Sequence, residues 1–367
     1  MIQRTETVDS KLIESILERR LDGERLSLEE GILLFNADLT LLGYAANQVK
    51  NQLHPEPVVT FVVDRNIATT NVCIVDCDFC AFYTPPRTDK GYVTQWDEIN
   101  QNLTDLTAIN GTQVLFQGGI NPDLRMKHYT DLFKKVMEHF PQVHIHSMSP
   151  EEIDYLCKCE KITAEEVFAA LKEAGLNSFP GGGAEILVDR VRQQISPKKA
   201  PADRWLDIMR SCHKSGLKAS ATMMYGHVET IEERVIHFLR LRELQDETNV
   251  FRAFIPWSFS AAGTPRMSHI PMAGGEDYLR TMAVARLMID NIPNFQTGWV
   301  TEGVKLAQIA LSFGANDMGG ILMEERVVKA TGITNETDTN EFIRLIKKTG
   351  NRAAQRDTNY KIVKYID

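Results

Sequence analysis

The sequence lacks several features that would place it in other classes of protein. No stretch of about 18 consecutive apolar residues occurs in its 367 residues, so no transmembrane span is predicted. The amino-terminal segment MIQRTETVDSKLIESILERR has no apolar block and no small-residue cleavage site, so it does not resemble a secretory signal. The formal charge of -8 is spread along the chain and basic clusters are short, which argues against a nucleic-acid partner. We therefore expect a cytoplasmic protein.

Cysteine is scarce too, but three of the six cysteines lie together. Cys73, Cys77 and Cys80 stand in NVCIVDCDFCAFYTPP with the spacing C-x3-C-x2-C. A structural zinc site would normally add a second C-x-x-C or a His pair, and none follows at a matching distance. In a large chain without export signals, such a group indicates a metal site or catalysis more often than disulfides. The other three, Cys157, Cys159 and Cys212, are interpreted as ordinary thiols.

The number of thiols suggests which metal group they bind. Thiolates are soft ligands that suit zinc or iron–sulfur clusters. A four-iron cluster usually takes four thiolates, so three from one loop leave one iron for another ligand. That ligand is either a distant residue of the chain or a small molecule bound from outside.

The hydrophobic pattern predicts parallel β/α architecture. Residues 1–55 are expected to form a helical extension, in which Ser27 and Glu30 make a capping box. In residues 56–367, eight candidate strands alternate with helical segments, which favours a TIM-like (β/α)8 barrel with a helical and strand cap at its carboxyl end. A doubly wound open sheet is the alternative, but its G-x-G-x-x-G fingerprint is missing, and PGGGAE does not supply it.

The predicted strands and helices are the following. The strands are VVTFVVDRNIA, TQVLFQGG, VHIHSMS, SFPGGGAEIL, KASATMMYG, VFRAFIPWSF, FQTGWVT and ANDMGGILM. The helices after residue 55 are 96–110, 126–140, 164–174, 202–214, 231–245, 276–291, 303–311 and 340–349. Functional-looking residues gather at the carboxyl ends of the strands, the face that carries the active site in β/α barrels.

The cysteine spacing, with an aromatic residue before the last cysteine, resembles the signature of the radical S-adenosylmethionine (radical SAM) superfamily. The resemblance implies a [4Fe-4S] cluster on Cys73, Cys77 and Cys80 whose fourth iron chelates S-adenosylmethionine. It also implies an electron donor such as flavodoxin or ferredoxin. Cofactor contacts are then expected from six residues: Phe79, Tyr83, Gln117, Gly118, Gly119 and Glu185. Phe82 is a further aromatic candidate.

Longer strings narrow the resemblance to one branch. CDFCAFY, TMMYGH, GWVTEG and QRDT are most similar to the cyclic dehypoxanthinyl futalosine synthases of menaquinone biosynthesis. Aminofutalosine synthases and the deazaflavin F0 synthases are the related alternatives. The resemblance implies that a 5'-deoxyadenosyl radical takes the C4' hydrogen of dehypoxanthine futalosine. The carbon radical would add to the benzoate ring, after which a proton and an electron leave.

That chemistry requires a proton acceptor and a partner for the benzoate carboxylate. Three residues near strand ends are candidates for the acceptor: His227, Glu302 and His146. The carboxylate would need an arginine or a hydroxyl pair, for which the candidates are Arg65, Arg252, Ser147 and Thr301. Asn316 and Asp317 are candidates for bonding to sugar hydroxyls. The sequence does not choose among them.

Overall fold

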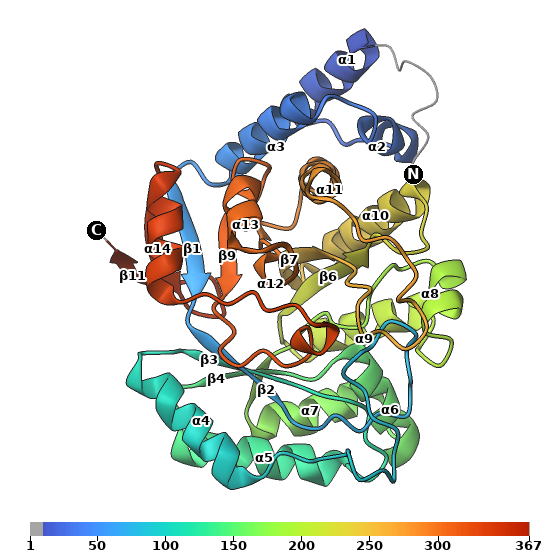
Figure 1. Ribbon diagram of the computed structural model, residues 1–367, viewed down its shortest axis with the longest axis vertical. Coiled ribbons are helices and arrows are strands. Elements are labelled where there is room, and N and C mark those ends of the chain that lie inside the picture. The colour runs from blue at the N-terminus through green and yellow to red at the C-terminus, as the bar shows by residue number, and fades with distance from the viewer. Residues whose placement is uncertain (1–9, 367) are drawn as a thin grey trace.

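Eight parallel strands close into a ring in the computed structural model, which describes residues 10–366 (Figure 1). Two hydrogen-bonded groups, β2–β5 and β6–β8, are joined by the bridge from Phe179 to Ala219. Bridges from Gln296 to Asp317 and from Arg65 to Met323 bring β9 between β8 and β2. The prediction of a (β/α)8 barrel is confirmed, and the open sheet is excluded. The strands are β2 (Asp64–Ala68), β3 (Gln113–Gln117), β4 (His144–Ser147), β5 (Leu176–Ser178), β6 (Ala219–Tyr225), β7 (Phe251–Ser258), β8 (Asn294–Phe295) and β9 (Asp317–Gly320).

The first barrel strand is split, and the carboxyl-terminal segment enters beside it. Before Val63 the chain forms β1 (Val58–Val62), which pairs with β9 and with β10 (Arg352–Arg356). After Val63, β2 pairs with β3 instead. The last strand, β11 (Ile362–Ile366), runs antiparallel to β10. The end of the chain therefore closes the amino-terminal end of the barrel, which we call the floor; the opposite end is the mouth.

Most predicted helices are present within a few residues, and two, α7 and α9, agree at both ends. Three helices were missed: α6, α8 and α12. The helices are α1 (Ser10–Leu21), α2 (Leu28–Leu34), α3 (Leu39–Leu53), α4 (Trp96–Ala108), α5 (Met126–His139), α6 (Pro150–Glu160), α7 (Ala164–Ala174), α8 (Asp189–Ile195), α9 (Ala202–Lys214), α10 (Ile231–Thr248), α11 (Gly275–Met288), α12 (Trp299–Glu302), α13 (Val304–Ala310) and α14 (Thr339–Lys348).

The expected strand FQTGWVT is wrong in its second half. Only Asn294–Phe295 is a strand, and Trp299–Glu302 forms the short helix α12. The indole N–H of Trp299 donates to the carbonyl of Gly320 at 2.8 Å, and the Tyr278 hydroxyl accepts from the N–H of Gly298 at 2.9 Å. These contacts with distant segments turn the chain away from the extended conformation.

The amino-terminal helices α1–α3 cover the outside of the barrel over α10 and α11 (Figure 1). The predicted capping box of Ser27 and Glu30 is present at α2. Two contacts are tight: a Cβ at Gly31 would meet Val235, and one at Gly43 would meet Phe313. Residues 1–9 lie outside the described residues, and the division into 1–55 and 56–367 stays a prediction.

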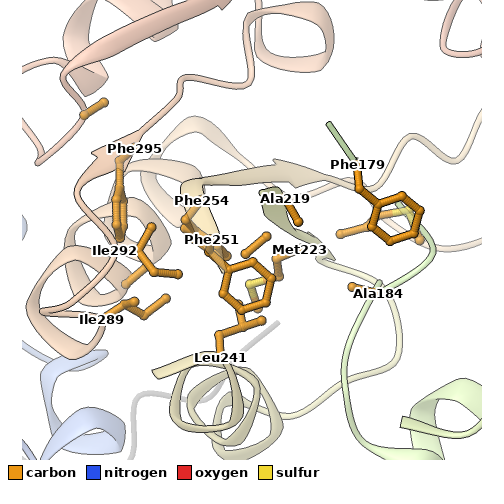
Figure 2. Packing of buried hydrophobic residues seen from close by; sticks show 14 of the residues in the cluster. Phe179, Ala184, Ala219, Met223, Leu241, Phe251, Phe254, Ile289, Ile292 and Phe295 are labelled. Carbon is orange, nitrogen blue, oxygen red and sulfur yellow. The ribbon is translucent and has the colours of Figure 1, made fainter. Parts of the chain in front are cut away.

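The apolar core lies between the strands and the surrounding helices. Figure 2 shows Phe254 of β7 and Phe295 of β8 among Leu241 of α10 and the residues that follow α11. The rings of Phe254 and Phe295 lie 5.2 Å apart between centroids. Full burial of one such side chain contributes about 1.5–3 kcal/mol to stability. No helix in residues 10–366 has both the length and the apolar content that crossing a membrane requires.

The inside of the barrel is polar. Gln113 donates to the Asp64 carboxylate at 3.1 Å, and the rings of His144 and His146 lie 2.9 and 2.6 Å from the Ser178 hydroxyl. Buried polar groups need such partners because each unpaired group costs free energy. The barrel interior is therefore organised by hydrogen bonds, whereas its outer face is organised by apolar packing.

Candidate active site

The cysteine loop follows β2 at the mouth, and Asn71 holds its two ends together. The Asn71 amide donates to the Thr84 hydroxyl and to the Lys90 carbonyl, both at 2.9 Å, and its carbonyl oxygen accepts from the N–H of Tyr92 at 2.9 Å. The loop between them is thereby fixed without regular secondary structure. This explains the position of the three cysteines at the carboxyl end of the first barrel strand.

The three thiols share a small apolar cluster that is separate from the main core. Val75 and Ile120 form it together with Cys77, and Phe79 and Tyr155 pack against it. Burial raises the pKa of Cys77 to about 12, and the nearby Lys199 ammonium acts in the opposite direction. A buried thiolate at this place needs a positive charge or a metal to compensate it.

The arrangement of these thiols fits an iron–sulfur cluster. Cys73, Cys77 and Cys80 are all free, and the N–H of Val75 lies 3.4 Å from the sulfur of Cys73. Main-chain N–H groups of Phe82 and Tyr83 bond to Cys80, whose pKa is nevertheless raised by burial. Hydrogen bonds to sulfur are a normal feature of cluster sites. In residues 10–366 no three His, Cys, Asp or Glu side chains are grouped to hold one metal ion. Cluster thiolates need no such convergence, because each binds a different iron.

Gly118 and Gly119 lie directly after β3 and pack closely against the start of the cysteine loop. A Cβ at Gly119 would lie 2.3 Å from the Val72 carbonyl and 2.8 Å from the Cβ of Cys73. One at Gly118 would lie 2.6 Å from the Thr69 hydroxyl. Both positions require glycine because the cysteine loop approaches the backbone here. This reason is sufficient without the cofactor contact expected from the sequence, which stays a prediction.

Glu185 lies after β5 and is paired with a lysine that the sequence did not single out. The carboxylate bonds to the Lys199 ammonium, and the two side chains are only 6% and 10% exposed. Burial alone would raise the pKa of Glu185, but Lys199 and Arg192 lower it. Glu185 also has a left-handed backbone, with φ of 41°. Its expected contact with the cofactor is untested, but its placement at the mouth agrees with that expectation.

The remaining expected cofactor contacts lie around the same place. The Phe79 ring packs on the thiol cluster, and the Lys199 ammonium lies 5.1 Å from its centroid. Tyr83 is half-buried in the cysteine loop. Gln117 is the last residue of β3, and its carbonyl accepts from the N–H of Thr69 at 2.8 Å. The structure brings all three to the mouth but does not test their contacts with a cofactor.

Glu302 lies at the mouth, at the end of α12. Its carboxylate accepts from the N–H of Ser258 at 2.9 Å, from the Ser258 hydroxyl at 2.5 Å and from the Thr301 hydroxyl at 3.1 Å. Burial raises the pKa of Glu302, although the bonds from Ser258 oppose this. The carboxyl is thus oriented, half-buried and closer than usual to taking up a proton near neutral pH.

His227, after β6, has both ring nitrogens next to backbone groups, one in β6 and one in the loop that follows it. Nδ1 accepts from the N–H of Val228 at 2.8 Å, and Nε2 lies 3.0 Å from the Met224 carbonyl. The side chain is fully buried, and burial lowers its pKa, although Glu229 acts in the opposite direction. The geometry gives His227 a structural position, and its proposed role as a base is untested.

His146 lies deeper, on β4 within the barrel. Burial is the largest of the causes that lower its pKa well below the usual value, followed by the charge of Arg252. Of the carboxylate candidates, Arg65 points outward, where it bonds to the Asn102 carbonyl at 3.2 Å and to Glu324 at 2.7 Å. Arg252 lies toward the floor and bonds to Asn359 at 2.7 Å. These two arginines therefore do not lie with Glu302 and the cysteine loop.

The other residues expected to bond to sugar hydroxyls or to the benzoate carboxylate already have partners within the chain. Asp317 is completely buried in an ion pair with Arg356 near the floor. Asn316 accepts from the N–H of Phe295 at 2.8 Å. The Ser147 hydroxyl donates to the Phe116 carbonyl at 3.2 Å. Thr301 lies at the mouth, where its hydroxyl bonds to Glu302.

Comparison with known proteins agrees with this geometry. Residues 67–241 match the radical SAM superfamily, and residues 248–367 match a family described as the CofH/MqnC C-terminal region. The chain is 42% identical over 356 residues to cyclic dehypoxanthine futalosine synthase of Halalkalibacterium halodurans, covering 97% of this chain and 96% of that protein. It is 37% identical to aminodeoxyfutalosine synthase of Thermus thermophilus, covering 98% of each.

A solved structure shares the fold at low sequence identity. The crystal structure of methylornithine synthase superposes with a TM-score of 0.72 at 16% identity, covering 92% of this chain and 97% of that one. Together, the fold, the free cysteine trio and whole-length identity to curated relatives lead to one conclusion. The chain belongs to the radical SAM superfamily, in the group that carries the CofH/MqnC carboxyl-terminal region.

Proposed function

We propose that this chain is a cyclase that converts dehypoxanthine futalosine to its cyclic spiro product in menaquinone biosynthesis. The observation that carries the proposal is the 42% identity, along nearly the whole chain, to a relative named cyclic dehypoxanthine futalosine synthase. The residues of the mouth support it, because three free thiols and an oriented carboxylate both lie at that end of a polar barrel interior.

As a radical SAM protein, the chain uses a [4Fe-4S] cluster and S-adenosylmethionine. Cys73, Cys77 and Cys80 would hold three irons. When bound, these cofactors supply the 5'-deoxyadenosyl radical, which removes the C4' hydrogen of the substrate's ribosyl group. The resulting substrate radical would add to the benzoate ring, and the ring would regain aromaticity by losing one proton to a base and one electron to the oxidised cluster.

We infer that the substrate is bound in the upper part of the barrel interior. Side chains alternate along a strand, so Leu115 and Gln117 face inward with Gln113. On β7, Phe254 faces the helices, which places Ile255 and Trp257 inside. These four lumen residues are only half-buried, which leaves room beside them. A chamber closed at its floor shields a radical from water, and fixed placement of the reacting atoms lowers the barrier.

We propose Glu302 as the group that accepts the proton from the ring. Among the three candidates, it alone combines a place at the mouth, a raised pKa and a carboxylate oriented by its neighbours. The two nitrogens of His227 face backbone atoms of the chain, and His146 lies against Ser178 further down the barrel. A base of this kind typically contributes about 10²- to 10⁴-fold to the rate.

A substrate assay tests the function directly. Anaerobically reconstituted protein, S-adenosylmethionine and dithionite are incubated with dehypoxanthine futalosine, and the products are identified by mass spectrometry. We expect a spirocyclic product of the substrate and an equal amount of 5'-deoxyadenosine. Consumption of the enolpyruvyl compound used by aminofutalosine synthases, with no conversion of dehypoxanthine futalosine, would assign the chain to that second group, to which it is 37% identical.

Two features of the cellular setting belong to the same proposal. The cluster needs a one-electron donor of low potential, such as flavodoxin or ferredoxin. Six free cysteines agree with a reducing compartment, and we infer that the enzyme works in the cytoplasm without nucleic acid. Pull-down of a flavodoxin or ferredoxin with the reconstituted enzyme, and turnover with that donor in place of dithionite, test the first of these.

A further inference from the structure

Two adjacent lysines in the loop before α9 have very different surroundings. The Lys198 side chain is 57% exposed and its ammonium lies 2.9 Å from the Asp76 carboxylate at the surface. The Lys199 side chain is 10% exposed and pairs with Glu185. The charge of Lys198 is solvated, whereas the charge of Lys199 is buried in the protein.

The Lys199 ammonium is directed toward the cysteine loop. It lies 5.1 Å from the centroid of the Phe79 ring, that ring packs on the cluster that contains Cys77, and the ammonium charge acts on the Cys77 thiol. A cation over an aromatic face is attracted to it, most strongly where water is excluded. The ring therefore holds the ammonium beside the thiols that would bind the cluster.

Buried contacts of the segments next to the Lys199–Glu185 pair fix the position of the ammonium. Arg192 is completely buried and donates to the carbonyls of Ala200, Gly183 and Ala184 at 2.6–2.9 Å, and it pairs with Glu151 at 3.0 Å. These contacts fix the segments on both sides of the Lys199–Glu185 pair.

This arrangement is not explained by stability. Removing a lysine and a glutamate from water costs several kcal/mol per ion, and buried pairs often add nothing net. Glu185 also adopts the left-handed backbone that non-glycine residues rarely take. Buried charges and backbone strain that occur together are typical of functional sites.

We propose that Lys199 is a positioning residue that supplies a fixed positive charge to the cluster and thereby raises its reduction potential. The cluster gains one electron from a low-potential one-electron donor, so its charge becomes more negative by one. A nearby buried cation stabilises the reduced form more than the oxidised form, because screening is weak there. The inference rests on the family's cofactor and does not depend on the substrate proposed above.

The test is an EPR-monitored redox titration with dithionite of the reconstituted protein without S-adenosylmethionine. We expect Lys199→Met to shift the midpoint potential in the negative direction, and Lys199→Arg to restore it. The matched control is Lys198→Met, which removes the neighbouring exposed charge and should leave the midpoint unchanged. Glu185→Gln removes the negative partner and should shift the midpoint in the positive direction.

The opposite signs for the two members of the pair make the test decisive. If Lys199→Met does not retain iron, the Glu185→Gln shift decides alone. A Lys199→Met protein with full iron and an unchanged midpoint overturns the proposal, and one that only binds S-adenosylmethionine more weakly assigns the lysine to ligand binding instead. A wild-type chain that takes up no cluster overturns it as well. Absence of the cyclised product with a normal cluster would count against the proposed substrate and leave this inference standing.

Discussion

The mouth and the floor of the barrel both bury charge, but they do so differently. At the floor, the Arg356 guanidinium donates two hydrogen bonds, of 2.5 and 2.9 Å, to the Asp317 carboxylate. Thr60 and the N–H of Gly319 fill the other acceptor positions of Asp317. At the mouth, Glu302 is held only by neutral donors, and burial raises its pKa. The Asp317 carboxylate at the floor is neutralised by an arginine, whereas the Glu302 carboxylate at the mouth is bonded to uncharged groups.

The backbone differs between the two ends in the same way. Left-handed residues at Lys161 and Asn249 simply end helices α6 and α10, a common role for that conformation. Left-handed residues also occur in loops where no helix ends. At the mouth these include Asp76, Met148, Glu185 and Leu322, and near the floor Tyr360 is one. Such conformations cost on the order of 1–3 kcal/mol each. The loops at the mouth therefore contain more of this backbone strain than the floor does.

The largest effect should come from the cysteine loop. Replacing Cys73 with Ala removes one of three iron ligands, so we expect complete loss of cluster absorbance, of bound iron and of 5'-deoxyadenosine formation. The unfolding transition should stay close to that of the wild type, because Cys73 belongs to the small cluster outside the main core. Cys159→Ala, a partly exposed thiol on α6, is the control and should retain full iron. Normal iron content in Cys73→Ala would contradict the cluster assignment.

The second largest effect should come from the proposed proton acceptor, Glu302, whose replacement should change the chemistry but not the fold. Glu302→Gln keeps an oxygen acceptor for Ser258 but cannot take up the proton, so we expect product formation to fall about 10²- to 10⁴-fold. Formation of 5'-deoxyadenosine should continue and become uncoupled from the product. The wild-type rate should rise with pH through the raised pKa of Glu302, and this acidic limb should disappear in the variant.

Alternative bases are compared by the same assay. His227→Gln and His146→Gln are measured beside Glu302→Gln at matched iron content. Loss of the acidic limb in either histidine variant, with Glu302→Gln retaining it, would move the role of base away from Glu302.

At the floor, the same kind of change should act on stability alone. Arg356→Met leaves the buried Asp317 carboxylate without its partner, which we expect to lower the free energy of unfolding by about 3–5 kcal/mol. Adding Asp317→Asn should recover part of this loss, because no uncompensated charge then remains. Arg352→Met, at an exposed position on the same strand, is the control. Denaturant unfolding measures all three, and an Arg356→Met chain as stable as the wild type would contradict the contrast between the two ends.

Local patterns account for what the sequence predicted correctly. The helix at 164–174 begins at a capping box of Thr163 and Glu166, and the helix at 202–214 begins directly after Pro201, so the signals that bound them are adjacent in the sequence. The cysteine spacing is local as well, so its meaning could be read without a structure. The strand expected at FQTGWVT failed because Trp299 bonds to Gly320, a contact that no window of neighbouring residues contains.

The sequence was limited in the same way for the residues of the site, because their roles depend on contacts with distant segments. Lys198 and Lys199 are adjacent and identical in type, and only the fold decides which one is buried beside the thiols. His227 and His146 were equally plausible bases, yet each is held by partners supplied by β6 and the loop after it or by β5. Residue type and spacing identify the chemistry, but the choice among equal residues depends on burial and on partners that are distant in the sequence.

The smallest effect we predict concerns a second acid near the mouth, Glu152 in the first turn of α6. Its carboxyl is buried with only Ser149 as a partner, and burial raises its pKa to about 7. Between an unfolded pKa of about 4.3 and the folded value, the native chain retains a proton that the unfolded chain releases, so stability falls as pH rises. Glu152→Gln should therefore be more stable than the wild type by up to about 3 kcal/mol at pH near 8, and by nothing at pH near 4.5. Urea unfolding of both proteins across this range measures the difference, and a gain that does not change with pH would show that burial of the charge is not its cause.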